Sequence, residues 1–340
     1  MEQANRERRT VNREPTEGGA VRIPEVDGLA VSVVVENSYD GLATGGRFGS
    51  ARVERTATPR GGDPRPRLLA EHGFALLVES WRGPERRAAL VDFSARASTL
   101  LNNLDALGVD LGRLDALFLS HGHDDHYGGL LAFLEAARPR LRPDLPVHVG
   151  GPDTFAHRWG VEEDGKRVDY GQLRRERIEA HGVRIEMPGA PALVAGHGLS
   201  SGPIPRRTPF ETVPARFRVE EGGELLPDQF HGEHALGFHV RGRGLVVLTS
   251  CGHAGVINSV RHLQEVAGVE RVHAILGGFH LAGAKEERIA RTLAGFRELA
   301  PEVLIPMHCA GMRITFELYR EMPDRFVPNT TGSRYIFEGA

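Results

Sequence analysis

A run of metal-binding side chains, Leu119-Ser120-His121-Gly122-His123-Asp124-Asp125-His126, constrains this chain more than any other segment. It places three imidazoles and a carboxylate within six residues, directly after a strand-like apolar stretch. Imidazole nitrogen and carboxylate oxygen are the donors that a borderline divalent cation such as Zn²⁺ selects. In extended backbone His121 and His123 point the same way, and Asp125 and His126 face a neighbouring position once the chain turns. The spacing predicts two metal ions side by side, and a solvated polar loop is the weaker alternative.

Composition excludes several other classes of protein. The 340 residues are 40% hydrophobic and 26% charged, which is typical of a globular protein with a core. A net charge of −3 gives no basic field to attract nucleic acid, and no 18-residue apolar stretch predicts a membrane span. The charged N-terminus lacks the apolar region of a secretory signal, so we expect a cytoplasmic protein. Two cysteines cannot build a disulfide framework, and each lies within two residues of a histidine.

The periodicity of the chain supports an α/β or α+β fold, and we expect one domain over residues 26–340, preceded by a polar, disordered tail over 1–25. Segments without a clear period, around 40–67 and 138–234, are interpreted as insertions, the first a long loop and the second containing a helix near 170–181. Elsewhere apolar runs predict strands at 29–35, 74–79, 88–92, 114–119, 236–240, 244–249, 272–276 and 303–306. Helical spacing of apolar residues predicts helices at 98–107, 129–137, 256–266 and 286–299.

The His-x-His-x-Asp-His run after a strand resembles the signature of the metallo-β-lactamase fold superfamily. The resemblance covers roughly residues 30 to 337 and implies a four-layer αββα sandwich. Six further motifs resemble one branch, the dihydropterin synthase-like metal-dependent hydrolases related to methanopterin biosynthesis: Glu71–Phe74, Asn102–Gly108, Ser201–Arg206, Cys251–Gly255, Gly277–Leu281 and Pro306–Cys309. The resemblance implies that His121 and His123 hold one metal, and that Asp125, His126 and His308 hold the other.

Two later strand ends supply the remaining candidate ligands. His308 follows the apolar strand 303–306, from which its side chain can enter a site. In many relatives an aspartate that bridges the two metals stands at the position of Cys251, which here is either a thiolate ligand or an inert buried thiol. The superfamily usually has one more histidine ligand before this strand. The candidates for this ligand are His197, His231 and His234, and none of them has a suitable sequence context. We therefore take His253 as the ligand in its place.

Three further residues are assigned roles around the metals. His280 ends a strand in a glycine-rich turn and either lines the pocket as a proton donor or is a structural loop histidine. Arg206 lies in a proline-rich segment, where a pre-positioned guanidinium suits a substrate phosphate or carboxylate, unless it is simply solvated. Asp92 is expected to hydrogen-bond a ligand histidine or to cap a loop. Residues Asn37, Glu71 and His72 match branch positions and receive no role beyond possible contacts behind the ligands.

These features lead to three functional hypotheses. The first is a dinuclear hydrolase in which two cations, zinc or else manganese, iron or nickel, lower the pKa of a shared water. Its catalytic residues are Asp125 and His280, and its substrate is a phosphoester or a related small molecule. The second, implied by the branch, is a synthase that joins a pterin to a ribosyl-aminobenzene phosphate. The third is a metal or ligand sensor without catalysis. The sequence leaves the metal, the substrate and the oligomeric state open.

Overall fold

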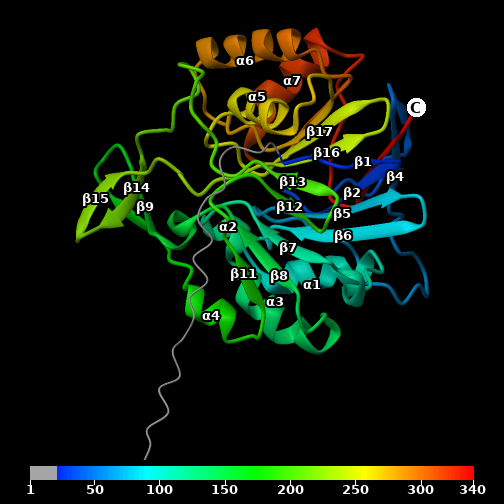
Figure 1. Cartoon of the computed structure of the whole chain (residues 1–340), viewed down its shortest axis with the longest axis horizontal. Helices are drawn as coiled ribbons and strands as arrows, with labels where there is room; N and C mark the ends of the chain where they lie inside the picture. The colour runs from blue at the N-terminus through cyan, green and yellow to red at the C-terminus, as the bar shows by residue number, and fades with distance from the viewer. Residues whose placement is uncertain (1–20) are drawn as a thin grey trace, which may run out of the picture.

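The computed structural model describes residues 21–340, and its framework is two mixed β-sheets packed face to face (Figure 1). The larger sheet has nine strands in the order β11-β8-β7-β6-β5-β2-β20-β4-β3. Its strands are β2 (Gly28–Val35), β3 (Gly46–Phe48), β4 (Ala51–Arg55), β5 (Ala75–Arg82), β6 (Glu85–Val91), β7 (Ala116–Leu119), β8 (Pro146–Val149), β11 (Arg184–Glu186) and β20 (Ser333–Glu338).

The smaller sheet has seven strands in the order β12-β13-β16-β17-β18-β19, with β1 added in parallel beside β16. Strands β17, β18 and β19 are parallel neighbours, so their carboxyl ends lie together at one edge of the sheet. The strands are β1 (Glu25–Val26), β12 (Ala192–Val194), β13 (Gly198–Ser200), β16 (Leu236–Val240), β17 (Gly244–Thr249), β18 (Val272–Gly277) and β19 (Val303–Pro306).

Side-chain alternation along the strands separates three apolar layers. In β7, Phe118 points into the core between the sheets, whereas Leu117 points outward to a second cluster. In β17, Val246 and Leu248 enter the central core, whereas Val247 packs in a third cluster on the outer face of the smaller sheet. Both sheets are therefore covered on both faces, which explains why β7 and β17 read as continuous apolar runs.

Helices form the two outer layers. The second cluster contains apolar side chains of α1 and α3, and the third contains those of α5, α6 and α7. The order helix, sheet, sheet, helix confirms the predicted αββα sandwich. The helices are α1 (Ala97–Ala106), α2 (Asp124–Tyr127), α3 (Leu130–Ala137), α4 (Arg175–Glu179), α5 (Val256–Ala267), α6 (Glu286–Leu299) and α7 (Met312–Glu321).

A third, four-stranded sheet in the order β10-β9-β14-β15 projects from the sandwich on the left of Figure 1. It is built from β9 (His157–Val161), β10 (Arg167–Gly171), β14 (Phe217–Glu221) and β15 (Glu224–Pro227). All four strands come from the segment 138–234. Phe217 and Phe230 at its base contact the ring of His123, so this sheet forms one wall of the site described below.

Two expectations for these irregular segments were wrong. The stretch 40–67 is not one long loop, because β3 and β4 extend the larger sheet there. The helix expected near 170–181 is limited to α4, since β10 occupies the start of that stretch and Gly171 has a φ of 82°. Segment 138–234 also contributes to both main sheets, through β8, β11, β12 and β13. Strands of three or four residues are too short to show a period, and pairing alone defines them.

At the N-terminus, most of the predicted tail over 1–25 lies outside the described residues. Within the described part, residues 21–25 belong to the domain, since Ile23 is buried and β1 pairs with β16. No sequence pattern predicted β20 or α7, although β20 pairs with both β2 and β4 in the larger sheet. In residues 21–340 we find no helix that combines the length and the apolar character needed to cross a membrane.

Candidate metal centre

The His121–His126 run lies at the junction of β7 and α2. His123 is still extended, with φ −92° and ψ 147°, and it is the N-cap of α2. The change from extended to helical backbone therefore separates His121 and His123 from Asp125 and His126. Gly122 is required between the two histidines, because a Cβ at that position would lie 2.2 Å from the carbonyl oxygen of Thr154.

The first cluster of donors is three buried imidazoles, His121, His123 and His253, whose ligand atoms lie within 4.8 Å of one another. The Nε2 atoms of His121 and His123, and both ring nitrogens of His253, find no hydrogen-bond partner within residues 21–340. Burial holds the pKa of all three rings well below the ordinary value, so they are neutral. Buried nitrogens without partners are costly, and a bound cation would satisfy them.

The second cluster joins Asp125, His126 and His308. Asp125 Oδ2 lies 3.1 Å from His308 Nε2 and 3.8 Å from His126 Nε2, and the two Nε2 atoms are 3.2 Å apart. Although burial lowers it, the pKa of His126 is raised to about 9 by the charges of Asp125 and Asp92. Asp125, His126 and His308 therefore hold a proton between them. A divalent cation bound by the same donor atoms would displace this proton.

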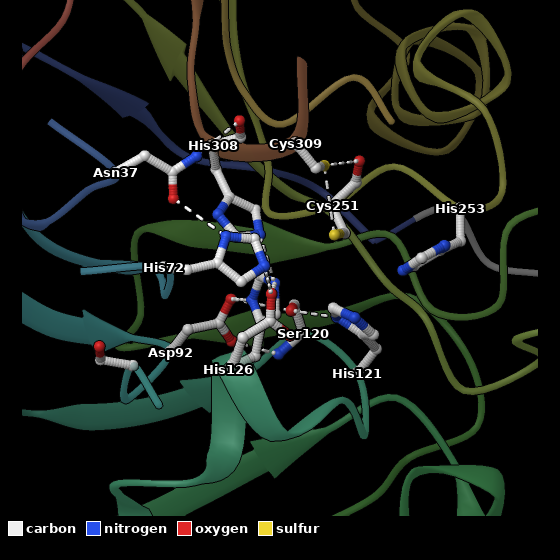
Figure 2. Close-up of polar contacts among 12 residues, drawn as sticks. Asn37, His72, Asp92, Ser120, His121, His126, Cys251, His253, His308 and Cys309 are labelled. Carbon is white, nitrogen blue, oxygen red and sulfur yellow. Dashed lines mark hydrogen bonds and ion pairs between the residues drawn. The ribbon is translucent and has the colours of Figure 1, made fainter. Parts of the chain in front are cut away.

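Asp92 fixes the orientation of ligand rings in both clusters (Figure 2). Its Oδ2 accepts a hydrogen bond from His126 Nδ1 at 2.7 Å and one from the Ser120 hydroxyl at 2.9 Å. Because the Ser120 hydrogen is used in this way, Ser120 Oγ accepts from His121 Nδ1 at 2.9 Å. The Nδ1 atoms of both histidines are thus used, which leaves Nε2 as the ring nitrogen that a cation could bind. The expected contact between Asp92 and a ligand histidine is confirmed.

Cys251 lies between the two clusters, as Figure 2 shows. Its Sγ lies within 4.8 Å of donor atoms of His121 and His126, and within the same distance of those of His253 and His280. A sulfur in this position can contact either metal or bridge both. The structure therefore brings all seven predicted ligands together, and their donor types fit two divalent cations.

Of the two predicted pocket residues, His280 lies beside the donor clusters, whereas Arg206 is bound to backbone carbonyl oxygens. The ring of His280 lies 4.2 Å from that of His253, with its Nδ1 buried and without a partner in the described chain. Arg206, expected to bind a substrate anion, instead donates to the carbonyl oxygens of His253 at 2.8 Å and Gln229 at 2.6 Å. This guanidinium positions the His253 loop, and its binding of substrate stays a prediction.

The alternative histidines do not reach the metals. His234 donates from Nε2 to the Leu119 carbonyl oxygen at 2.9 Å, and its Nδ1 lies 2.7 Å from Ser200 Oγ, so both ring nitrogens are used. His197 Nδ1 contacts Ser80 Oγ at 3.0 Å on another part of the sheets. His231 is exposed. The donor clusters found within residues 21–340 contain His253 and none of these three.

Comparison with known proteins identifies the family. The sequence pattern of the metallo-beta-lactamase superfamily matches residues 70–250, which is more than half of the chain. The chain belongs to the metallo-beta-lactamase superfamily. It is an enzyme, as the predicted resemblance implied.

Individual relatives place the chain within this superfamily. It is 26% identical, over 76% of its length and 87% of the relative, to 7,8-dihydropterin-6-methyl-4-(beta-D-ribofuranosyl)-aminobenzene-5'-phosphate synthase of Methanocaldococcus jannaschii. A shorter match, 33% identical, covers 36% of this chain and 45% of a hydroxyacylglutathione hydrolase of Aeromonas salmonicida. A crystal structure described as a metal-dependent hydrolase of the beta-lactamase superfamily shares the fold, with a TM-score of 0.68 and 23% identity over 90% of this chain and 98% of that one.

Two carboxylates that the sequence did not indicate hold the loops that carry His308 and His253. Glu36 accepts the backbone N–H of His308 on both oxygens, at 2.8 and 3.1 Å. Glu233 accepts the N–H groups of His253, at 2.9 Å, and of Ala254, at 2.5 Å. Glu36 directly follows β2, and Glu233 directly precedes His234. The one sequence signal for such a residue is a carboxylate placed next to the end of an apolar strand.

His72 is a further group that the sequence analysis left without a role. Its Nε2 lies 3.4 Å from Asp125 Oδ2, and its ring stacks on His308 at 5.2 Å. The structure therefore adds an exposed imidazole to the second cluster.

Proposed function

We propose that this protein is a dinuclear metal-dependent hydrolase of small phosphoesters or phosphodiesters, with zinc as the expected metal. One observation carries the proposal, the meeting of two separate donor clusters at Cys251. Cys251 Sγ lies within 4.8 Å of donor atoms of His121 and His253 from the first cluster and of His126 and His308 from the second. When bound, two divalent cations would lower the pKa of a water and stabilise negative charge on the substrate.

The side chains of the protein prepare this chemistry. Asp92 and Ser120 hold the tautomers of His126 and His121, so that no ring must turn when a cation binds. Arg206 and Glu233 together hold the backbone that presents His253. Rigid ligands of this kind keep the reacting groups in one geometry and reduce the reorganisation that the reaction requires.

His280 is the proposed proton donor to the leaving group. Its ring packs against His253 and Phe217, and it also lines the neighbouring cavity. Its φ of 46° is unusual for a residue with a Cβ, so the glycines before it and the turn hold it in a strained position. An imidazole between the metals and the substrate cavity is suitably placed for general acid catalysis.

The cavity beside His280, about 920 Å³ in volume, supports an anionic substrate. Three arginines line it, namely Arg216, Arg218 and Arg288, and the acidic turn 162–164 lines it as well. The guanidinium of Arg216 lies 4.9 Å above the ring of Phe217, which in turn contacts His123 and His280. A positive charge this close to the metals favours a phosphate-bearing substrate over a neutral one.

The proposal is tested by elemental analysis combined with hydrolysis assays on a chromogenic phosphodiester, a phosphomonoester and a carboxylic ester. We expect about two metal equivalents per chain and hydrolysis of a phosphoester. His123→Ala should remove one metal and lower turnover by at least about 100-fold. The control is His181→Ala, in the turn after α4, which should keep both properties. An unchanged metal content and rate in His123→Ala would contradict the proposal.

A synthase activity is the second candidate, because a synthase is the relative that matches 76% of this chain. The same metal donors could position a pterin and a ribosyl-aminobenzene phosphate, whose phosphate would enter the arginine-lined cavity. The two activities are separated by incubating the metal-loaded protein with a dihydropterin diphosphate and the aminobenzene partner. A condensation product, with no release of phosphate from model phosphoesters, would favour the synthase over the hydrolase.

A further inference from the structure

The two cysteines of this chain are in contact beside the metal centre. Cys251 Sγ and Cys309 Sγ lie 3.3 Å apart, although 58 positions separate them in the sequence (Figure 2). Cys309 Sγ also donates to the Cys251 carbonyl oxygen at 3.2 Å. Both cysteines are free thiols, and the chain contains no others. The contact thus joins the sulfur at the centre of the metal site to the only other thiol of the protein.

The contact is built into the end of the smaller sheet. Cys251 follows β17 and Cys309 follows β19, and β18 lies between these two strands. Gly278, after β18, donates its N–H to the Ser250 carbonyl oxygen at 3.1 Å, and Leu281 donates to that of Cys309 at 3.1 Å. A Cβ on Gly278 would lie 2.6 Å from Cys309 Sγ. The loops therefore pass closely around a glycine, and the two sulfurs are held together.

The two cysteines differ in exposure only as whole residues, since both sulfurs belong to the buried donor cluster. Cys251 is buried, with 3% of its surface exposed, whereas Cys309 is partly exposed. A disulfide has a sulfur–sulfur distance of about 2.05 Å, so the thiols must approach each other by little more than about 1 Å. A small oxidant that enters the metal site and oxidises one sulfur therefore finds the second thiol already in place. Thiol pairs of this kind are typical of redox-sensitive sites.

We propose that Cys251 and Cys309 form an oxidation-sensitive thiol pair that closes to a disulfide and withdraws Cys251 Sγ from the metal centre. The formation of the disulfide depends only on the thiol contact. Its consequence for the metals rests on the proposed function, in which Cys251 Sγ contacts one or both cations. Because a disulfide sulfur is a much weaker ligand than a thiolate, closure would loosen the metals that Cys251 holds.

The chemistry balances with a hydroperoxide as the oxidant. Cys309 sulfur attacks the peroxide oxygen, the O–O bond breaks, and a sulfenic acid and one water form from hydrogen peroxide. Cys251 sulfur then attacks the sulfenyl sulfur, the S–O bond breaks, and the second water leaves with the remaining thiol proton. Two electrons pass from the two sulfurs to the peroxide. A dithiol such as dithiothreitol reverses the change by thiol–disulfide exchange.

The test treats the full chain, metal-loaded and metal-free, with a small excess of hydrogen peroxide. Free thiols, intact mass under non-reducing conditions and bound metal are measured before and after. We expect both thiols to disappear, the monomer mass to fall by two hydrogens, and the metal-loaded protein to lose at least half of its metal. Dithiothreitol and added metal should restore the starting values. Bound metal should slow the oxidation, because it competes for the Cys251 thiolate.

Cys309→Ser is the matched variant, and its metal content after peroxide treatment is compared with that of the same variant before treatment. It removes the partner thiol but keeps Cys251, so the same peroxide dose should leave its metal content unchanged. If the wild-type chain keeps both thiols, gains oxygen mass or forms only intermolecular dimers, the thiol pair is refuted. If the disulfide forms but the metal stays, or if Cys309→Ser loses as much metal as wild type, the withdrawal of Cys251 is refuted. If the reduced protein binds no metal, the proposed function is contradicted. The thiol count and the intact mass then still show whether Cys251 and Cys309 form a disulfide.

Discussion

Asp92 and His126 form a fully buried ion pair, with Asp92 Oδ2 2.7 Å from His126 Nδ1. The same carboxylate oxygen accepts from Ser120, which accepts from His121, so one aspartate orients a ring in each donor cluster. Its position immediately after β6, beside the end of β7, brings it behind the histidine run. In the proposed dinuclear site, metal affinity at both positions would therefore depend on a residue that contacts neither metal.

Replacing Asp92 therefore provides the first prediction. Asp92→Asn keeps the shape but loses the charge and can present an N–H where His126 needs an acceptor, so His126 Nε2 is no longer fixed as the ligand atom. We expect metal affinity to fall about 10–100-fold, measured by competition with a chromogenic chelator. Asp105→Asn, on the exposed side of α1, is the control and should match wild type. Equal affinities for the two variants would show that Asp92 has no such role.

The second prediction concerns His253 as the substitute ligand. His253→Ala should lower the metal content from about two equivalents to about one, because His121 and His123 alone leave the first position incomplete. His231→Ala removes an exposed histidine that the sequence offered for the same place and should keep both metals. Elemental analysis of the two purified variants distinguishes these outcomes. Loss of metal from His231→Ala rather than His253→Ala would reverse the assignment.

The third prediction is a dependence of stability on pH at His234. Burial lowers the pKa of His234 to about 4, whereas the unfolded chain has the ordinary value of 6.5. Between these values the unfolded state binds more protons, so the stability that His234 contributes is present above pH 6.5 and is lost as the pH falls toward 4. A shift of this size corresponds to about 3 kcal/mol.

Urea unfolding of the metal-free protein at several pH values measures this loss. His234→Gln keeps a donor for the Leu119 carbonyl oxygen but does not titrate, so its stability should fall less than that of wild type between pH 6.5 and 4. His181→Gln, at a partly exposed position, should follow wild type. Parallel curves for wild type and His234→Gln would refute the prediction.

The fourth prediction concerns the arginine-lined cavity. Arg216→Ala removes an exposed cation that lies over Phe217 and lines the cavity. We expect KM for a phosphate-bearing substrate to rise about 10-fold, with little change in kcat and a weaker dependence on salt. A neutral ester, if it is hydrolysed, should show no such change. Arg177→Ala, in α4 and outside the cavity, is the control. A rise in KM for both kinds of substrate would indicate that Arg216 does not select phosphate.

Long elements of the fold could be predicted from the sequence, and short ones could not. The strands at 236–240, 244–249 and 303–306 and the helix at 286–299 have the predicted bounds, because buried strands and amphipathic helices leave a clear pattern. Strands β3 and β13, by contrast, have three residues each and exist only because a neighbouring strand pairs with them. The expected helix near 170–181 failed for the opposite reason, since the sheet pairing of β10 overrode a local pattern.

The candidate site divides in the same way. The residue types and spacing of His121–His126 were sufficient to predict metal donors, because few other roles place three imidazoles and a carboxylate on one strand end. The sequence also indicated Cys251, His253 and His308 by their positions after apolar strands. It favoured His253 over His234 only because His234 had no suitable sequence context, although both lie near strand ends. The structure decides between them through hydrogen bonds, as both nitrogens of His234 are used and those of His253 are free.

The sequence by itself thus indicated the superfamily and its layered fold through the resemblance of its motifs, and the chemical nature of the site through residue type and spacing. Only the tertiary structure decided which donors meet, that Arg206 holds a loop, and that Cys309 touches Cys251. The physical reason is that strands β7, β17 and β19 are far apart in the sequence and adjacent only at the carboxyl edges of two packed sheets. Contacts made there depend on strand order and loop path, which no single segment encodes.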